Sequence, residues 1–206
     1  MNQKIRKLVV MAMLVALSIV LVYVVHFPIF PAAPFLEYDP ADIPILIGTF
    51  AFGPLAGVML TVVTSLIQGF TVSAQSGVMG IAMHIFATST LVLVAGNIYR
   101  LHRTKKGAVV ALVVGTLAMT MAMVVFNYFI TPYFITPDIS DAAAVAANRG
   151  FVATLLVPVI VPFNLIKAGV NSVITFVVYK TVSRHLIHGE SWKKHTNMEG
   201  NVQAEQ

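Results

Sequence analysis

A lysine lies near the middle of an apolar run of roughly thirty residues, and two asparagines share its helical face. Asn164, Lys167 and Asn171 follow one another at i, i+3 and i+7 within 151–179, the spacing of one side of an α-helix. A charge at that depth costs at least ~2.5–3.5 kcal/mol, so the side chain should face a cavity or a partner rather than lipid. An ammonium flanked by amides offers donors and acceptors to a polar small molecule. These three residues are therefore the first candidates for a binding site.

Lys167 has two other interpretations. Lys180 lies thirteen residues further on, about 20 Å along a helix, so Lys167 is too deep to reach the membrane surface. The ammonium could instead bind carbonyls that Pro158 and Pro162 leave without a helical partner. Asn127, in a second apolar run, is a further buried amide that could bond a neighbouring helix or contact a ligand.

The composition is that of a polytopic membrane protein. The chain has 206 residues, of which 58% are hydrophobic and 10% charged, and its mean hydropathy is +0.86. Hydropathy and the positions of Gly and Pro predict an all-α fold of six transmembrane helices in one domain, residues 1–183. Residues 184–206 are polar and are expected to form a disordered cytoplasmic tail. The six expected spans are 6–27, 41–53, 54–70, 77–100, 107–134 and 151–183.

The distribution of charge predicts the orientation. With six spans, the basic residues near both termini and in the 100–106 loop fall on one side, and most acidic residues fall in loops on the other. The positive-inside rule then places the N- and C-termini in the cytoplasm.

Several shorter segments carry expectations of their own. Residues 35–39 alternate apolar and acidic side chains like a short strand, and Asp42 is expected to cap the second helix. Residues 142–147 could form an interfacial helical turn in the longest outer loop. Ala12 and Ala16 allow another helix to approach closely, either within the protein or from another subunit. A polar stripe that ends at Gln68 in the third helix could line a cavity or bond neighbouring backbones; its other members are Thr61, Thr64 and Ser65.

Several classes of function are disfavoured. The sequence has no cysteine, no His-Glu-x-x-His, no Gly-x-Ser-x-Gly and no phosphate-binding Gly-x-x-x-x-Gly-Lys-Ser/Thr loop. An enzyme is therefore not expected, nor ATP hydrolysis by this chain, nor a resident cofactor. His26 and His84 are isolated and are interpreted as packed residues rather than metal ligands. The basic residues follow membrane topology, so no nucleic-acid partner is expected.

Three segments resemble a known family. They are Phe35-Leu36-Glu37-Tyr38-Asp39-Pro40-Ala41-Asp42-Ile43-Pro44, running into Gly48 to Gly57; Asn127-Tyr128-Phe129; and Pro162-Phe163-Asn164-Leu165-Ile166-Lys167-Ala168-Gly169. Together they resemble the substrate-binding S components of energy-coupling factor (ECF) vitamin importers, most of all the riboflavin-specific ones. The resemblance covers roughly residues 6–183.

The resemblance implies a six-helix subunit of a bacterial cytoplasmic membrane. Such a subunit captures the vitamin outside and docks on a transmembrane coupling protein driven by two ATPase subunits. Carried over, the family's flavin contacts are Asn127, Asn164 and Lys167, with the loop around Leu36 and Tyr38 covering the ring. The family's docking motif falls on Ala12 and Ala16.

The sequence also departs from the riboflavin-type pattern. Thr61 and Thr64 stand where charged residues are usual, and residues 76–84 lack an expected Glu and Asn. An S component for another vitamin or small nutrient therefore remains an alternative to riboflavin. A solitary ion-coupled transporter ranks lower, because every Asp and Glu falls in a predicted loop or tail.

Overall fold

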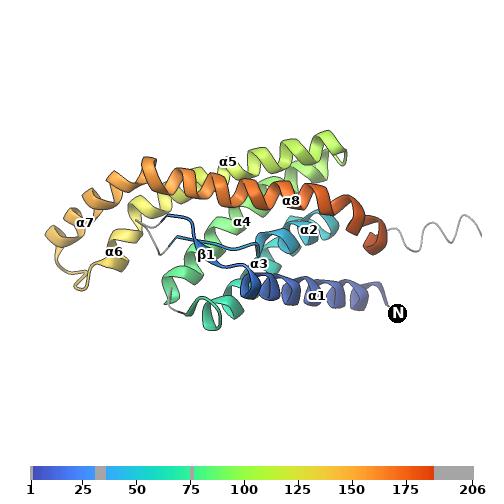
Figure 1. The fold of residues 1–206 in the computed structure, drawn as a ribbon, viewed down its shortest axis with the longest axis horizontal. Coiled ribbons are helices and arrows are strands. Elements are labelled where there is room, and N and C mark those ends of the chain that lie inside the picture. The colour runs from blue at the N-terminus through green and yellow to red at the C-terminus, as the bar shows by residue number, and fades with distance from the viewer. Residues whose placement is uncertain (1, 31–35, 75–76, 188–206) are drawn as a thin grey trace, which may run out of the picture.

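The computed structural model describes residues 2–30, 36–74 and 77–187, with side chains as far as residue 179. Its helices pack lengthwise into an elongated bundle (Figure 1). Within the bundle α4 packs on α3 and α5, and α8 packs on α2 and α5. The elements are α1 (Gln3–Val24), β1 (Phe27–Pro28), β2 (Glu37–Tyr38), α2 (Asp42–Phe52), α3 (Pro54–Phe70), α4 (Gly77–Leu101), α5 (Lys105–Phe129), α6 (Thr131–Ile135), α7 (Ala142–Leu155), the π-helix η2 (Leu156–Ile160) and α8 (Val161–Ile187).

The chain leaves α1 and forms a small antiparallel ladder before it enters α2. Phe27 pairs with Tyr38 and Pro28 with Glu37, and the rings of Phe27 and Tyr38 lie 5.4 Å apart. Within the segment expected to be strand-like, Glu37 and Tyr38 form β2, whereas Phe35 lies outside the described residues. The ladder directs the following residues, 39–41, into the bundle.

The junction of α2 and α3 lies at Gly53, as the sequence analysis expected. Gly53 has φ +95°, a conformation that favours glycine, and Pro54 begins α3 at the first helical position. Asp42 does not cap α2. It is the first helical residue, the side chain of Ala41 before it makes no capping bond, and the Asp42 carboxylate bonds other helices instead.

The fifth predicted span, 107–134, is divided in the structure. Helix α5 ends at Phe129, and the short helix α6 follows with its proline, Pro132, in the first turn. Proline lacks an N–H donor and suits the start of a helix rather than its interior.

The last predicted span, 151–183, corresponds to a longer continuous helical segment that consists of α7, η2 and α8. Residues 142–147, expected as an interfacial turn, are the first part of α7, and α7, η2 and α8 follow without a break. Pro158 lies in the middle of η2. Proline removes one backbone donor, and the hydrogen-bond pattern widens around Pro158.

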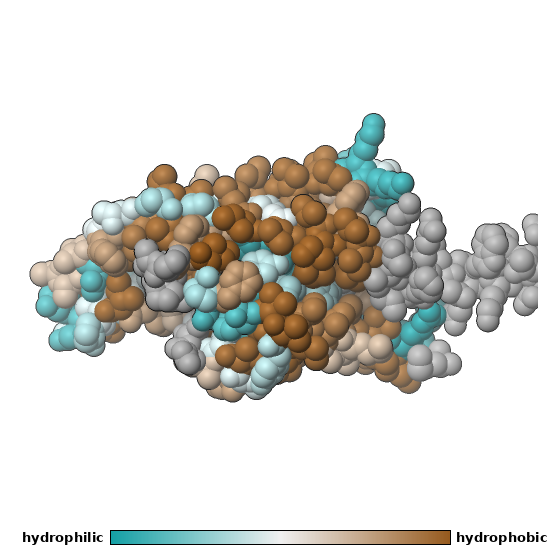
Figure 2. Space-filling view, viewed as in Figure 1, coloured by the Kyte–Doolittle hydropathy of each residue, from teal (hydrophilic) through white to brown (hydrophobic). Residues whose placement is uncertain are grey.

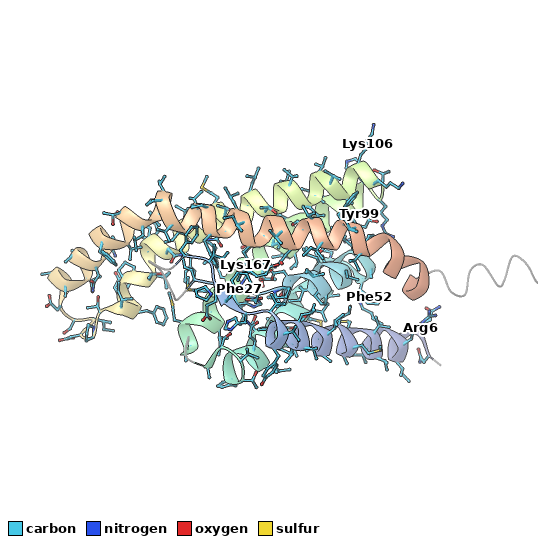
Figure 3. All side chains as sticks on the ribbon, viewed as in Figure 1. Arg6, Phe27, Phe52, Tyr99, Lys106 and Lys167 are labelled. Carbon is cyan, nitrogen blue, oxygen red and sulfur yellow. The ribbon has the colours of Figure 1, made fainter. Side chains whose placement is uncertain are left out.

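Four helical segments are long and apolar enough to cross a membrane, namely Gln3–Val24, Gly77–Leu101, Lys105–Phe129 and Ala142–Tyr179, while α2 and α3 are shorter apolar helices. Apolar side chains cover much of the visible flank, and hydrophilic ones lie at the two ends and in a patch near the middle (Figure 2). Arg6 and Lys106 lie at the same end (Figure 3). The structure is therefore that of a multi-pass helical membrane protein, and the count of six spans and the side of the termini remain predictions.

Candidate ligand-binding site

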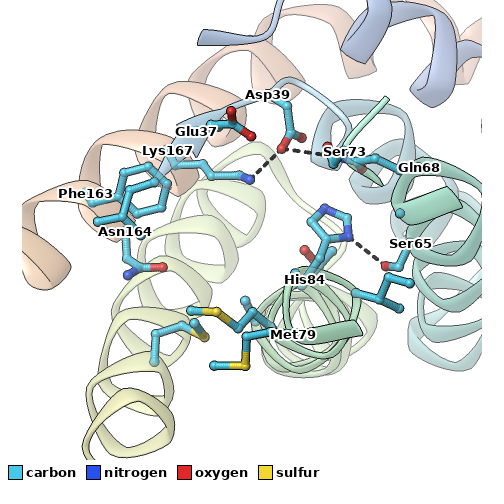
Figure 4. Close-up of a pocket in the computed structure, with 18 of the residues that line it drawn as sticks. Glu37, Asp39, Ser65, Gln68, Ser73, Met79, His84, Phe163, Asn164 and Lys167 are labelled. Atoms are coloured by element: carbon cyan, nitrogen blue, oxygen red, sulfur yellow. Dashed lines mark hydrogen bonds and ion pairs between the residues drawn. The ribbon is translucent and has the colours of Figure 1, made fainter. Parts of the chain in front are cut away.

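A cavity of about 200 Å³ opens between α3, α4, α5, α8 and the segment that leads into α2. Figure 4 shows its walls. One part is apolar and rich in methionine, with Leu36, Met79, Met83, Met119, Met123 and Phe163 among its residues. The other part is polar, with Asp39, Ser65, Gln68, Ser73, His84, Asn127, Asn164 and Lys167. An apolar pocket with a few converging polar groups is the usual form of a small-molecule site.

Lys167 lies on the cavity wall, and its hydrogen-bond partner is a carboxylate. Its Nζ donates to Asp39 Oδ2 at 2.7 Å, and both side chains are buried. Burial alone would raise the pKa of the Asp39 carboxyl. The Lys167 ammonium, His84 and the hydrogen bonds from Lys167 and the Ala41 N–H together outweigh burial and lower the pKa to about 2. An ion pair therefore compensates the charge, whereas carbonyls near Pro158 and Pro162 were the alternative.

Asn164 and Asn127 present their amides to the same cavity. Asn164 donates to the Ile160 carbonyl at 2.8 Å, and Asn127 donates to the Met123 carbonyl at 2.8 Å. These bonds to the preceding helical turn fix which way each amide points. Asn127 Oδ1 also accepts from Thr131 at 3.0 Å.

Asn171 and Tyr38 lie beside the cavity but do not line it. Asn171 is fully buried; it donates to the Asp39 carbonyl and to Asp42 Oδ2, both at 3.1 Å. Its Oδ1 accepts from the Tyr38 hydroxyl at 2.9 Å. These bonds hold the segment that carries Asp39 against α8, so both residues position the wall. Leu36, by contrast, is on the wall itself.

The acidic side of the site does not follow from the sequence pattern. Asp39 and Asp42, assigned to an outer loop and a helix cap, are almost entirely buried. Asp42 Oδ1 accepts from Thr88 at 2.7 Å and lies 3.7 Å from His84 Nε2. The two aspartates and Lys167 are far apart in the sequence, and neither periodicity nor spacing links them.

The polar stripe of α3 has both of the roles that were considered. Thr61 and Ser65 donate to carbonyls of their own helix at 2.9 and 2.7 Å, whereas Ser65 and Gln68 also line the cavity.

Ala12 and Ala16 lie away from the cavity. Both are exposed along α1, among large apolar side chains that are also exposed, including Leu8, Met13 and Leu17. Neither alanine is used in packing the interior, which leaves this face of α1 open to lipid or another protein.

Comparisons with known proteins agree on one family. The family model of the substrate-specific component of ECF transporters matches residues 6–179. The riboflavin transporter FmnP of Bacillus subtilis is 31% identical over 85% of this chain and 91% of its own length. The riboflavin transporter RibU of Staphylococcus aureus is 30% identical over 89% and 94%. These relatives are transporters and not enzymes.

A solved structure has the same fold. It is the S component of a bacterial ECF transporter, with a TM-score of 0.72 and 29% identity over 90% of this chain and 99% of the solved chain. The family match over most of the chain, the relatives at about 30% identity and the shared fold agree with one another. The chain belongs to the family of ECF transporter substrate-specific components.

Proposed function

We propose that this protein captures riboflavin, or a closely related flavin, outside the cell and delivers it to an ECF importer. The observation that carries the proposal is the cavity wall on which Lys167, Asn164 and Asn127 meet beside an apolar, methionine-rich slot. The relatives named riboflavin transporters, at about 30% identity, support the choice of ligand.

The chemistry of the cavity suits a flavin. An ammonium has three N–H donors, and Lys167 gives one of them to Asp39. The others remain for the carbonyl oxygens of a pyrimidinedione ring, and amides such as Asn164 match its alternating donors and acceptors. Leu36 and Phe163 offer apolar surface to the dimethylbenzene end.

A flavin must also enlarge the cavity. The cavity has a volume of about 200 Å³, which is below the ~300–1,000 Å³ typical of pockets for ligands of this size. Met79, Met83, Met119 and Met123 line it, and methionine adapts to a new neighbour more readily than branched residues do. We therefore expect the methionine wall to repack around the ring while the polar wall stays in place.

The proposed assembly follows from the family. The protein would lie in the cytoplasmic membrane of a bacterium with six helices across the bilayer and both termini inside. The exposed face of α1 around Ala12 and Ala16 would contact a transmembrane coupling protein, which two ATPase subunits drive.

Titration of riboflavin with the purified protein in detergent tests the ligand. The fluorescence of the flavin should be quenched on binding, with a submicromolar dissociation constant. Submicromolar binding of a different vitamin, without any binding of flavin, would contradict the riboflavin assignment and favour an S component for that vitamin.

A solitary ion-coupled transporter is the second candidate, and the buried carboxylates favour it. Asp39 and Asp42 are both buried beside the cavity, and such groups carry coupling ions in other transporters. Against this, Asp39 pairs with Lys167 and Asp42 accepts hydrogen bonds from Thr88 and Asn171, so both carboxylates already have partners. Uptake into vesicles without ATPase subunits, abolished by an uncoupler, would favour this candidate.

A further inference from the structure

Gln68 lines the cavity and has a buried acceptor atom without a hydrogen-bond partner. The side chain is 6% exposed and lies on the wall of the cavity. Its Nε2 donates to Asp39 Oδ2 at 3.4 Å and to Ser73 Oγ at 3.3 Å, whereas Oε1 has no hydrogen-bond partner. A carboxylate only accepts, so the NH₂ end must face Asp39 and the orientation of the amide is fixed.

His84 lines the same cavity and also has a buried side-chain atom without a hydrogen-bond partner. Its Nδ1 lies 2.7 Å from Ser65 Oγ, and the single hydroxyl hydrogen of Ser65 goes to the Thr61 carbonyl at 2.7 Å. Ser65 Oγ must therefore accept from Nδ1–H. In the neutral ring this leaves Nε2 as an acceptor. Asp42 Oδ1 lies 3.7 Å from Nε2, but a carboxylate only accepts, so Nε2 is buried without a hydrogen-bond partner.

Gln68 Oε1 and His84 Nε2 both belong to residues of the same cavity wall. Of the five buried side-chain atoms without a partner in the described part of the chain, only these two belong to residues that line the cavity. Gln68 comes from α3 and His84 from α4, and Figure 4 shows both on the side of the cavity away from Asn164 and Phe163. A buried acceptor without a donor is costly, and a ligand that brings donors removes that cost.

We propose that Gln68 and His84 form a subsite for the polyhydroxyl chain of the ligand. This inference rests on the proposed function, because it concerns the same cavity. The flavin ring offers mainly carbonyl and ring-nitrogen acceptors, which suit Lys167 and the amides. The hydroxyl groups of the ribityl chain are its main donors. Gln68 Oε1 and His84 Nε2 accept from two of these hydroxyls, so the two polar walls recognise different ends of one molecule.

A comparison of two ligands tests the subsite. Lumiflavin has the same ring system as riboflavin but a methyl group in place of the ribityl chain. Wild-type protein should bind riboflavin at least about tenfold more tightly than lumiflavin by fluorescence titration, the change expected when hydrogen bonds to buried acceptors are lost. Gln68→Met and His84→Phe should each weaken riboflavin binding about tenfold and change lumiflavin binding less than about twofold.

Thr64→Val is the matched control. Thr64 Oγ1 is also buried and unpartnered, one helical turn before Gln68, but Thr64 does not line the cavity. This variant should bind both flavins as the wild type does.

Three outcomes would overturn the subsite. Equal wild-type affinity for riboflavin and lumiflavin would show that the chain is not recognised, and this comparison needs no variant to fold. Equal weakening of both flavins in Gln68→Met and His84→Phe would show that these residues act only by supporting Asp39 and α3. Failure of the wild type to bind either flavin would contradict the proposed function itself, and the subsite with it.

Discussion

Lys167 carries a positive charge into an apolar helix, and Asp39, 128 positions away in the sequence, supplies the opposite charge. A buried ion pair of this kind is costly to desolvate and is often no more stable than an apolar replacement. Its position at the cavity suggests a different reason for its presence. The pair keeps an ammonium ionised and oriented where a polar ligand edge can reach it.

The pair and the ligand site can be separated by substitution. Lys167→Met should abolish flavin binding and destabilise the protein by about 3–5 kcal/mol, because it leaves the Asp39 carboxylate buried without a counter-charge. The double variant Asp39→Asn with Lys167→Met removes both charges, so it should regain most of the stability without regaining flavin binding. Thermal unfolding in detergent and flavin titration measure the two effects. Full flavin affinity in the double variant would show that the ammonium is not a ligand contact.

At the scale of elements, small residues decide how closely the helices approach. Helix α3 contacts both α2 and α4 at Gly57, where a Cβ atom would overlap Thr49 Oγ1 and lie 3.0 Å from Val92 Cβ. A Cβ atom added to Gly169 on α8 would have no other atom within 4 Å. The two glycines therefore differ in packing, although both lie inside apolar helices.

This difference predicts opposite effects of the same substitution. Gly57→Ala should destabilise the protein by about 1–3 kcal/mol, since Thr49 and Val92 must move apart. Gly169→Ala should leave stability unchanged or raise it by up to about 1 kcal/mol, because alanine is the better helix former. Thermal unfolding of the two variants side by side is the measurement. A Gly57→Ala protein as stable as the wild type would mean that α2, α3 and α4 are less tightly packed here.

At the scale of the whole molecule, the proposed ligand site and the proposed docking face lie on separate surfaces. The cavity opens between α3, α4, α5 and α8, whereas Ala12 and Ala16 are exposed along α1, at the edge of the bundle (Figure 1). A change on α1 can therefore block assembly without touching the ligand.

Ala12→Trp should leave flavin affinity unchanged and lower flavin uptake at least about tenfold in cells that hold the ATPase-driven partners. The indole would keep a facing helix from the close approach that small residues allow. Leu117→Trp on α5 is the control, because Leu117 is 56% exposed and apolar and lies on a different helix. Normal uptake by Ala12→Trp would exclude this face of α1 as the docking surface.

The sequence by itself determined the class of the fold and part of the site. Hydropathy identified the long helices, because each must bury or expose an apolar surface over a full membrane thickness. The i, i+3, i+7 spacing found Lys167 and Asn164 because helical periodicity is local. Hydropathy also marked Asn127 as a buried amide, and the resemblance to a family added Leu36; the structure places both on the cavity wall.

Only the tertiary structure decided which charges meet. Asp39 and Asp42 looked like loop residues, yet the β1–β2 ladder and Asn171 bring them into the interior beside Lys167 and His84. Gln68 and His84 become a pair only because α3 and α4 pack side by side. Ion pairs and unpartnered buried atoms depend on distances between segments far apart in the chain, and no pattern within one helix contains those distances.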